Sequence, residues 1–249
     1  MKVSRTRTGQ VLWVEVNRPD ALNAVDFDVM AGLEEALDEA EREVPRVFVL
    51  SGAGDRSFIS GGDLKQFSEL VTDVDARKMA SRMVAILARI EALPCWTLAC
   101  INGDAYGGGT ETLLAFDLRV AAPTAHLGFT QSRFHLPPGW GGLTRLVEAV
   151  GASRAQYWLA TASVISAQEA HSAGLVHEVH DHVRQAAQRR AEKLALMEPE
   201  LVHALKKGIR RAKTLPRDES IAAELEPFAS IWAGEEHHRR VAGWVSGQQ

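Results

Sequence analysis

The chain has 249 residues, of which 46% are hydrophobic and 24% are charged, so it can form one large domain or a domain with an appendage. The formal net charge is −4 at pH 7, and the lysines and arginines are scattered, which argues against a nucleic-acid or membrane-surface role. The first residues lack the apolar core of a signal peptide, and no run approaches the ~20 apolar residues of a membrane span. A cytoplasmic protein is therefore expected.

The two cysteines, Cys95 and Cys100, belong to one predicted strand and its start, and they are interpreted as small buried apolar residues. In an extended segment they lie too far apart to form a disulfide. No spacing typical of metal ligands is present. The sequence therefore predicts neither a disulfide nor a metal site.

The first part of the chain alternates between strand and helix patterns. Strands are expected at 11–16 and 46–50, and an amphipathic helix is expected between them at 27–40, where Asp26 can cap its start. A strand, a helix and a second strand form the crossover unit that builds parallel sheets. Another amphipathic helix is expected between 73 and 91. An α/β fold follows from this alternation.

A short buried strand at 96–101 leads through three glycines, 107–109, into a predicted helix. Glycines let the backbone approach a ligand closely, and the unpaired amides at a helix start favour negative charge. Such a turn can stabilise a developing anion, and Glu111 places a carboxylate one turn into the same helix. The alternative is a tight turn that only packs against a neighbour. A phosphate loop is disfavoured because no Gly-Lys-Ser/Thr or G-x-G-x-x-G pattern is present.

Residues 57–65 repeat this arrangement. Phe58 and Ile59 form a short apolar piece, Gly61 and Gly62 form a turn, and a helix is expected to start at Asp63. Asp63 is interpreted first as a helix cap and second as a catalytic group. The two loops together could supply two backbone donors to one ligand.

Two further strands are expected, at 117–122 and 125–129, followed by an irregular segment rich in proline and glycine at 130–142. Trp140 in this segment either walls a pocket or fills the core. After a short strand at 174–179, the chain reads as three or four helices. We therefore expect a core at 1–180 and a C-terminal helical region at 181–249.

Taken together, these motifs resemble the enoyl-CoA hydratase/isomerase (crotonase) family over nearly the whole chain. The segments that carry the resemblance are Asn17–Ala24, Phe58–Leu64, Ile101–Glu111, Pro138–Leu146 and Ala167–Val176. The resemblance implies an α/β fold built as a spiral of β-β-α turns, with a C-terminal helical region that forms a homotrimer or hexamer. It also implies an acyl-CoA substrate and no cofactor other than the coenzyme A of that substrate.

By position in these motifs, the amides of Gly62 and Gly108 would hold the thioester oxygen, and Glu111 would transfer protons. Reactions beside a thioester carbonyl pass through an enolate, and two fixed N–H donors stabilise its charge. The remaining matched positions would bind the substrate: Ala21, Leu22, Ser60, Gly61, Asp63, Leu64, Arg133 and Trp140.

One departure from the family pattern concerns the reaction. Family hydratases use two glutamates for general acid–base chemistry, and Glu111 matches the first. No Asp or Glu lies between Asp117 and Glu148, and Ser132 or Arg133 stands about where the second is expected. An arginine cannot act as a base at neutral pH, although it could pair with a substrate carboxylate, contact a phosphate of CoA or simply lie at the surface.

The segments 129–142 and 231–234 resemble the ethylmalonyl-CoA decarboxylase branch of the family. Decarboxylation of a malonyl-type thioester gives the enolate directly and needs only an acid. The sequence is therefore compatible with three functions: hydration or isomerisation with one glutamate, decarboxylation of a short branched malonyl-CoA of the ethylmalonyl or methylmalonyl type, and non-catalytic binding of acyl-CoA by a trimer.

Overall fold

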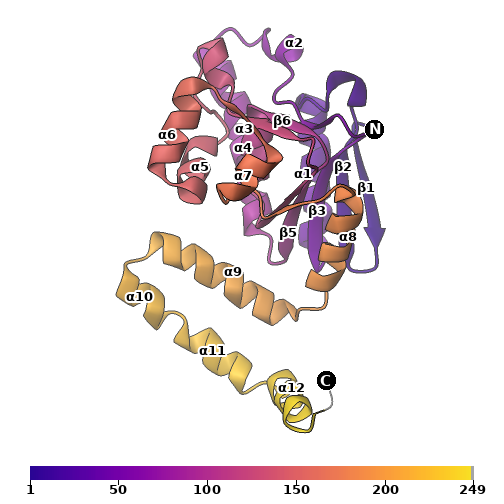
Figure 1. Ribbon diagram of the computed structural model, residues 1–249, viewed down its shortest axis with the longest axis vertical. Coiled ribbons are helices and arrows are strands. Elements are labelled where there is room, and N and C mark those ends of the chain that lie inside the picture. Colours follow the sequence, from indigo (N-terminus) through magenta and orange to yellow (C-terminus); the bar gives the residue numbers. More distant parts are fainter. Residues whose placement is uncertain (248–249) are drawn as a thin grey trace. The chain divides into compact units, whose positions relative to one another are not determined.

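The structure is a computed structural model that describes residues 1–247. The chain divides into two compact units, residues 1–196 and a unit that begins at Met197 (Figure 1). The first unit contains all the strands of the described residues, and the second consists of helices.

The first unit is built on two β-sheets. A six-stranded sheet has the order β1-β2-β3-β5-β7-β10, and a four-stranded sheet has the order β4-β6-β8-β9. The strands of the larger sheet are β1 (Val3–Thr8), β2 (Val11–Val16), β3 (Val47–Gly52), β5 (Trp96–Ile101), β7 (Leu118–Ala121) and β10 (Glu178–Val179). Those of the smaller sheet are β4 (Ser57–Ile59), β6 (Asp104–Tyr106), β8 (His126–Gly128) and β9 (Val164–Ser166). In both sheets the central strands pair in parallel, and β1 and β9 pair antiparallel with their neighbours.

Consecutive strand pairs alternate between the two sheets. In the pairs β3/β4, β5/β6 and β7/β8, the first strand joins the larger sheet and the second joins the smaller one. Helical residues follow each pair before the chain returns to the larger sheet. This repetition is the spiral of β-β-α turns that the sequence resemblance implied, so the α/β fold class is confirmed.

Helices cover the sheets and close the core. Asp26 caps α1, accepting a hydrogen bond from the Val29 amide at 2.8 Å, as its sequence position predicts. The helical segments of the first unit are η1 (Pro19–Ala21), α1 (Phe27–Arg42), α2 (Leu64–Phe67), α3 (Asp73–Ala92), α4 (Gly108–Leu113), η2 (Gln131–Phe134), α5 (Gly142–Val150), α6 (Ala152–Thr161), α7 (Ala167–Ser172) and α8 (Val183–Leu194).

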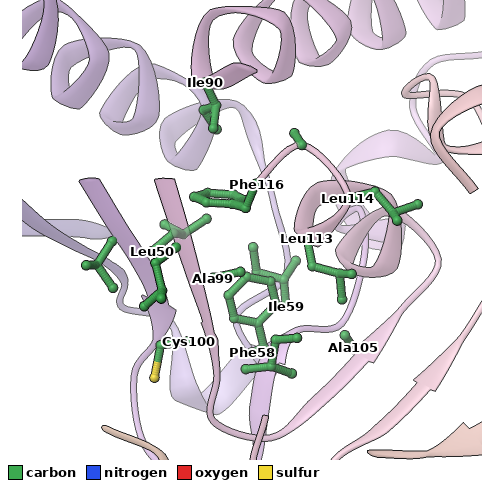
Figure 2. Close-up of a cluster of buried hydrophobic side chains, with 14 of the residues drawn as sticks. Leu50, Phe58, Ile59, Ile90, Ala99, Cys100, Ala105, Leu113, Leu114 and Phe116 are labelled. Carbon is green, nitrogen blue, oxygen red and sulfur yellow. The ribbon is translucent and has the colours of Figure 1, made fainter. Parts of the chain in front are cut away.

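A continuous hydrophobic core joins both sheets to α4. Figure 2 shows Leu50 of β3, Phe58 of β4 and Leu113 of α4 converging in it. Cys95 and Cys100 are buried, as predicted, and burial raises the pKa of the Cys100 thiol to about 12. The buried face of α4 is therefore fixed by packing against strands of both sheets.

Some elements differ from those predicted. No strand is predicted from the sequence at β1, and β6 and β9 are three-residue strands that are too short to produce a periodic pattern. Among the residues described after 181 there are five helices rather than three or four. The first of them, α8, packs against β5 and β7 of the first unit, and that unit ends at Leu196. The second unit contains α9 (Pro199–Thr214), α10 (Arg217–Ala222), α11 (Leu225–Trp232) and α12 (Glu235–Val245).

Gly109 lets α4 pack closely on β4 because it has no side chain, and this yields a testable prediction. A Cβ at residue 109 would lie 1.8 Å from the Ile59 carbonyl oxygen, whereas one at Gly139 would meet nothing within 4 Å. Because overpacking typically costs about 1–3 kcal/mol, Gly109→Ala should lower the free energy of unfolding by at least this amount. Gly139→Ala is the matched control and should change it by less than about 0.5 kcal/mol. Urea denaturation followed by circular dichroism measures both, and equal stabilities would contradict the packing described.

Candidate active site

The loops that follow β4 and β6 lie at the same edge of the smaller sheet. These strands pair in parallel, so their carboxyl ends are adjacent. The first loop is held by the 22–25 segment: the Ser60 amide donates to the Leu22 carbonyl at 3.2 Å, and the Val25 amide donates to the Gly61 carbonyl at 2.8 Å. The sheet therefore brings together two glycine turns that are far apart in the sequence.

The amide of Gly62 is not used by the backbone bridge that holds its loop. Val25 pairs with Gly62 in a parallel bridge. The Val25 N–H donates to the Gly61 carbonyl, and the Val25 carbonyl accepts from the Asp63 amide, each at 2.8 Å. In a parallel bridge, the residue between two bonded neighbours directs its own N–H to the opposite side. The Gly62 N–H is therefore directed away from Val25.

The second glycine turn contacts the first. Gly61 has a φ of +114°, and a Cβ there would lie 3.1 Å from the Tyr106 carbonyl oxygen and 3.5 Å from the Gly108 nitrogen. Gly108 is the first residue of α4, so its N–H is among those with no acceptor within the helix. Only a glycine at 61 combines this backbone conformation with so close an approach.

Trp140 covers both glycines. Its side chain is 5% exposed, and its ring atoms lie 2.1–2.6 Å from the position of a Cβ on Gly108 and 3.6 Å from that of a Cβ on Gly62. The sequence left open whether this residue walls a pocket or fills the core. Its indole does pack in the core, and it does so against the two glycines whose amides are the candidate donors.

Glu111 lies one turn behind Gly108 on α4 and is 2% exposed. Its Oε2 accepts hydrogen bonds from the Trp140 amide at 2.7 Å and the Gly142 amide at 2.8 Å. Its Oε1 accepts from the Gly139 amide at 3.2 Å and from Gln131 Nε2 at 2.8 Å. Gly142 begins α5, and a Cβ on it would lie 2.3 Å from Glu111 Cγ, so a glycine is required for this contact.

Two opposing effects act on the acidity of Glu111. Burial raises its pKa above the ordinary value of 4.5, and the hydrogen bonds from residues 142, 140, 131 and 139 partly offset that rise by stabilising the carboxylate. The net effect is a raised pKa. Glu111 can therefore retain a proton at pH values where an exposed glutamate has lost it.

Gln131, the first residue of η2, is the side chain that faces Glu111. The sequence interpretation expected Ser132 or Arg133 there, and this was wrong: Ser132 is exposed, and Arg133 Nη2 donates to the Ala162 carbonyl at 2.9 Å. A glutamine at this place carries no carboxylate, so it does not match the two-glutamate pattern of the family. The turn of η2 decides which side chain faces Glu111, because its first residue reaches α4 and its third reaches the end of α6.

The other predicted binding residues surround the first loop. Asp63 caps α2, accepting from the Lys65 amide at 3.1 Å and the Gln66 amide at 3.3 Å, and it also pairs with Arg18 at 2.8 Å. The hydrogen bond from Arg18 lowers the pKa of Asp63, as expected for a structural carboxylate rather than a proton donor. Ala21, Leu22, Ser60 and Leu64 lie beside this turn and are at least partly exposed. Arg133 is exposed and directed away from Glu111.

Within residues 1–247, no group of three His, Cys, Asp or Glu side chains is placed to hold a metal ion. No helix in the same described range is long and apolar enough to cross a membrane. The groups gathered at the candidate site are backbone amides, one carboxyl, one side-chain amide and one indole.

The fold and these motifs define the class of protein. The family model of enoyl-CoA hydratase/isomerase matches residues 6–245, so the chain belongs to the enoyl-CoA hydratase/isomerase (crotonase) family. A crystal structure of an enoyl-CoA hydratase from Bacillus anthracis superimposes with a TM-score of 0.94 at 30% identity, covering 99% of this chain and 97% of that one.

Curated relatives have different reactions in their names. The short-chain-enoyl-CoA hydratase of Clostridium acetobutylicum is 31% identical over 242 residues, covering 96% of this chain and 92% of the relative. The ethylmalonyl-CoA decarboxylase of Homo sapiens is 29% identical over 232 residues, covering 91% of this chain and 76% of the relative. These two relatives thus share the family but differ in the reaction that their names give.

The environment of Glu111 predicts an unusual titration. Because burial outweighs the hydrogen bonds, the Glu111 carboxyl should titrate above its ordinary value of 4.5. Glu34 is the internal control, because its hydrogen bond with Arg82 lowers its pKa. Nuclear magnetic resonance of 13C-labelled glutamate carboxyls, assigned with Glu111→Gln and Glu34→Gln, measures both. Titration of Glu111 at or below Glu34 would contradict the electrostatic balance.

Proposed function

We propose that this protein is an acyl-CoA lyase that decarboxylates a short branched malonyl-CoA, of the ethylmalonyl or methylmalonyl type. The amides of Gly62 and Gly108 hold the thioester oxygen, and Glu111 is the one proton-transfer group. The observation that carries the proposal is the pairing of Glu111 with the neutral amide of Gln131, where a two-carboxylate hydratase would have a second glutamate.

The proposed chemistry needs one acid and no base. The bond between the α-carbon and the substrate carboxylate breaks, CO₂ leaves, and the electron pair remains as a thioester enolate. The two amides stabilise the enolate oxygen, for which one such donor is typically worth about 3 kcal/mol of barrier. Protonated Glu111 then gives its proton to the α-carbon, and the resulting carboxylate is reprotonated by water. One proton is consumed and a saturated acyl-CoA is released.

Three features support this reaction. Decarboxylation requires Glu111 in its protonated form, whereas a general base acts in its deprotonated form. The raised pKa of Glu111 favours the protonated form. Trp140 lies against both glycines and limits the room at the acyl group, in keeping with a short acyl chain. A relative named ethylmalonyl-CoA decarboxylase aligns over 91% of the chain.

Hydration by a single glutamate is the second candidate. It is favoured by the short-chain-enoyl-CoA hydratase that aligns over 96% of this chain at 31% identity. In that reaction Glu111 would orient and deprotonate a water molecule. Gln131 could then accept a hydrogen bond from this water but could not supply the proton that the α-carbon needs.

Parallel assays of ethylmalonyl-CoA and crotonyl-CoA separate the two reactions. We expect CO₂ release and butyryl-CoA from the former and no measurable hydration of the latter. The matched control is Glu111→Gln, which keeps the side-chain volume and removes the acid. Because general acid catalysis typically contributes about 10²–10⁴-fold, kcat should fall by that factor while the affinity for butyryl-CoA stays within a few-fold.

Other results of these assays would replace the proposal. Hydration of crotonyl-CoA without CO₂ release would establish the second candidate. Tight binding of both thioesters without turnover would favour a non-catalytic acyl-CoA-binding protein. An unchanged kcat in Glu111→Gln would remove this residue from the mechanism.

We also propose that the protein is a homotrimer, or a hexamer of two trimers, held together through the C-terminal unit. That unit exposes large apolar side chains, including Phe228 at 63% and Trp232 at 55%, and these surround a hollow of about 740 Å³ on α9 and α11. Exposed apolar groups of this size on one unit are typical of an interaction surface.

Self-association predicts a mass in solution of at least three times 27.2 kDa. Light scattering coupled to size-exclusion chromatography measures it. Trp232→Ser should lower the mass because it removes apolar area from the surface. Val71→Ser changes a residue of the first unit that is 85% exposed and should leave the mass unchanged. A monomeric wild-type protein would exclude the trimer.

A further inference from the structure

Gln131 leaves one polar atom without a partner. Its Nε2 donates to Glu111 Oε1 at 2.8 Å, whereas its own Oε1 is the one buried side-chain nitrogen or oxygen among residues 1–247 that has no hydrogen-bond partner. A buried acceptor that lacks a donor is destabilising. The observed orientation of this amide is therefore satisfied at one end only.

The donors around Glu111 determine where a proton can reside. Oε2 accepts from the amides of Trp140 and Gly142, both fixed by the start of α5. A backbone N–H cannot become an acceptor, so a proton on Oε2 would face two donors. Oε1 faces a single backbone donor, the Gly139 amide at 3.2 Å, and Gln131, whose side-chain amide can exchange its two ends by rotating about its last torsion angle. Neutral Glu111 should therefore carry its proton on Oε1 and donate it to Gln131.

The same rotation releases the amide nitrogen. When Gln131 Oε1 accepts the Glu111 proton, Nε2 occupies the buried place of the unpaired oxygen, where its N–H groups need an acceptor. The Gln131 amide lies beside Gly107, with its Cδ 3.9 Å from the position of a Cβ on that residue, immediately before the Gly108 amide. A carboxylate on the α-carbon of a bound thioester would lie near this position, because that carbon is bonded to the carbonyl carbon.

We propose that Gln131 is a positioning residue that couples binding of the substrate carboxylate to protonation of Glu111. With Glu111 charged, Gln131 turns its amide nitrogen to Glu111. With a malonyl-type acyl group bound, the amide reverses, its oxygen accepts the Glu111 proton, and its nitrogen donates to the substrate carboxylate. Binding of the anion and loading of the acid then occur together. This inference rests on the proposed decarboxylation, whose acid it supplies.

Charged groups on the elements packed around Glu111 are directed elsewhere. Arg145 of α5 pairs with Glu91 at 2.6 Å, Tyr106 donates to Asp104 within β6, and Arg133 of η2 donates to Ala162. Two further titratable groups on these elements, Glu148 of α5 and His135 after η2, are exposed. Gln131 is thus the side chain of this group that contacts the Glu111 carboxyl.

The test measures proton uptake on binding a ligand that cannot react. S-(2-carboxypropyl)-CoA is a thioether that carries the carboxylate of a methylmalonyl group and has no thioester carbonyl, so it cannot lose CO₂. S-propyl-CoA lacks the carboxylate and is the matched ligand. Calorimetric titrations in two buffers of different ionisation enthalpy, at a pH above the Glu111 transition of the free protein, give the protons taken up with each.

We expect wild-type protein to take up more protons with the carboxypropyl ligand than with the propyl ligand, by a difference approaching one per site. Gln131→Met keeps the size of the side chain without its amide and should abolish this difference. Because a hydrogen bond to a charged group is lost, it should also weaken carboxypropyl-CoA binding about 10-fold or more. Propyl-CoA binding should be nearly unchanged. Ser132→Ala, at the exposed neighbour on η2, should behave as wild type in every measurement.

Gln131→Glu provides an independent variant if the methionine substitution impairs folding. It should repel the ligand carboxylate and weaken carboxypropyl-CoA binding relative to propyl-CoA. An equal proton uptake with the two ligands in wild type, or an excess that persists in Gln131→Met, would overturn the inference. The thioether reports binding alone, so failure of the protein to decarboxylate ethylmalonyl-CoA would refute the proposed function without altering this result.

Discussion

A buried carboxylate is costly unless enough donors surround it, and Glu111 meets this condition through the start of another helix. The amides of Trp140 and Gly142 bind one of its oxygens, and Gly139 and Gln131 bind the other. Because Trp140 belongs to the segment that supplies these donors, the same interaction carries its indole over the glycine turns. The position of the charge and the shape of the site therefore depend on one contact between α4 and α5.

The spiral of strand pairs brings together the two glycine loops of the site. Each turn contributes a strand to the smaller sheet, and the parallel pairing of β4 with β6 sets their following loops side by side. Gly109 lets α4 approach the carbonyl of Ile59, and Gly61 lets the first loop approach the Gly108 nitrogen. Two candidate donors from distant parts of the sequence thus lie together through main-chain geometry, which side-chain substitutions elsewhere can leave intact.

The partner of Glu111 bears on the choice of reaction within the family. Two carboxyls facing one another suit the transfer of two protons, as addition of water to a double bond requires. A carboxyl facing an amide suits a reaction with one proton transfer, because the amide is neutral and can donate or accept. Because of the pairing of Glu111 with Gln131, we propose loss of CO₂ rather than hydration.

The sequence alone determined the α/β alternation, the long helices α1 and α3, the two glycine turns and the carboxylate behind the second, because each depends on neighbours in the chain. It did not reveal the short strands β6 and β9, since three residues carry no periodicity. Only the tertiary structure decided that Gln131, rather than Ser132 or Arg133, faces Glu111, and that Trp140 covers both glycines. These contacts join segments separated by tens of residues, and the direction of each side chain is set by a turn and a helix start whose orientation local sequence does not encode.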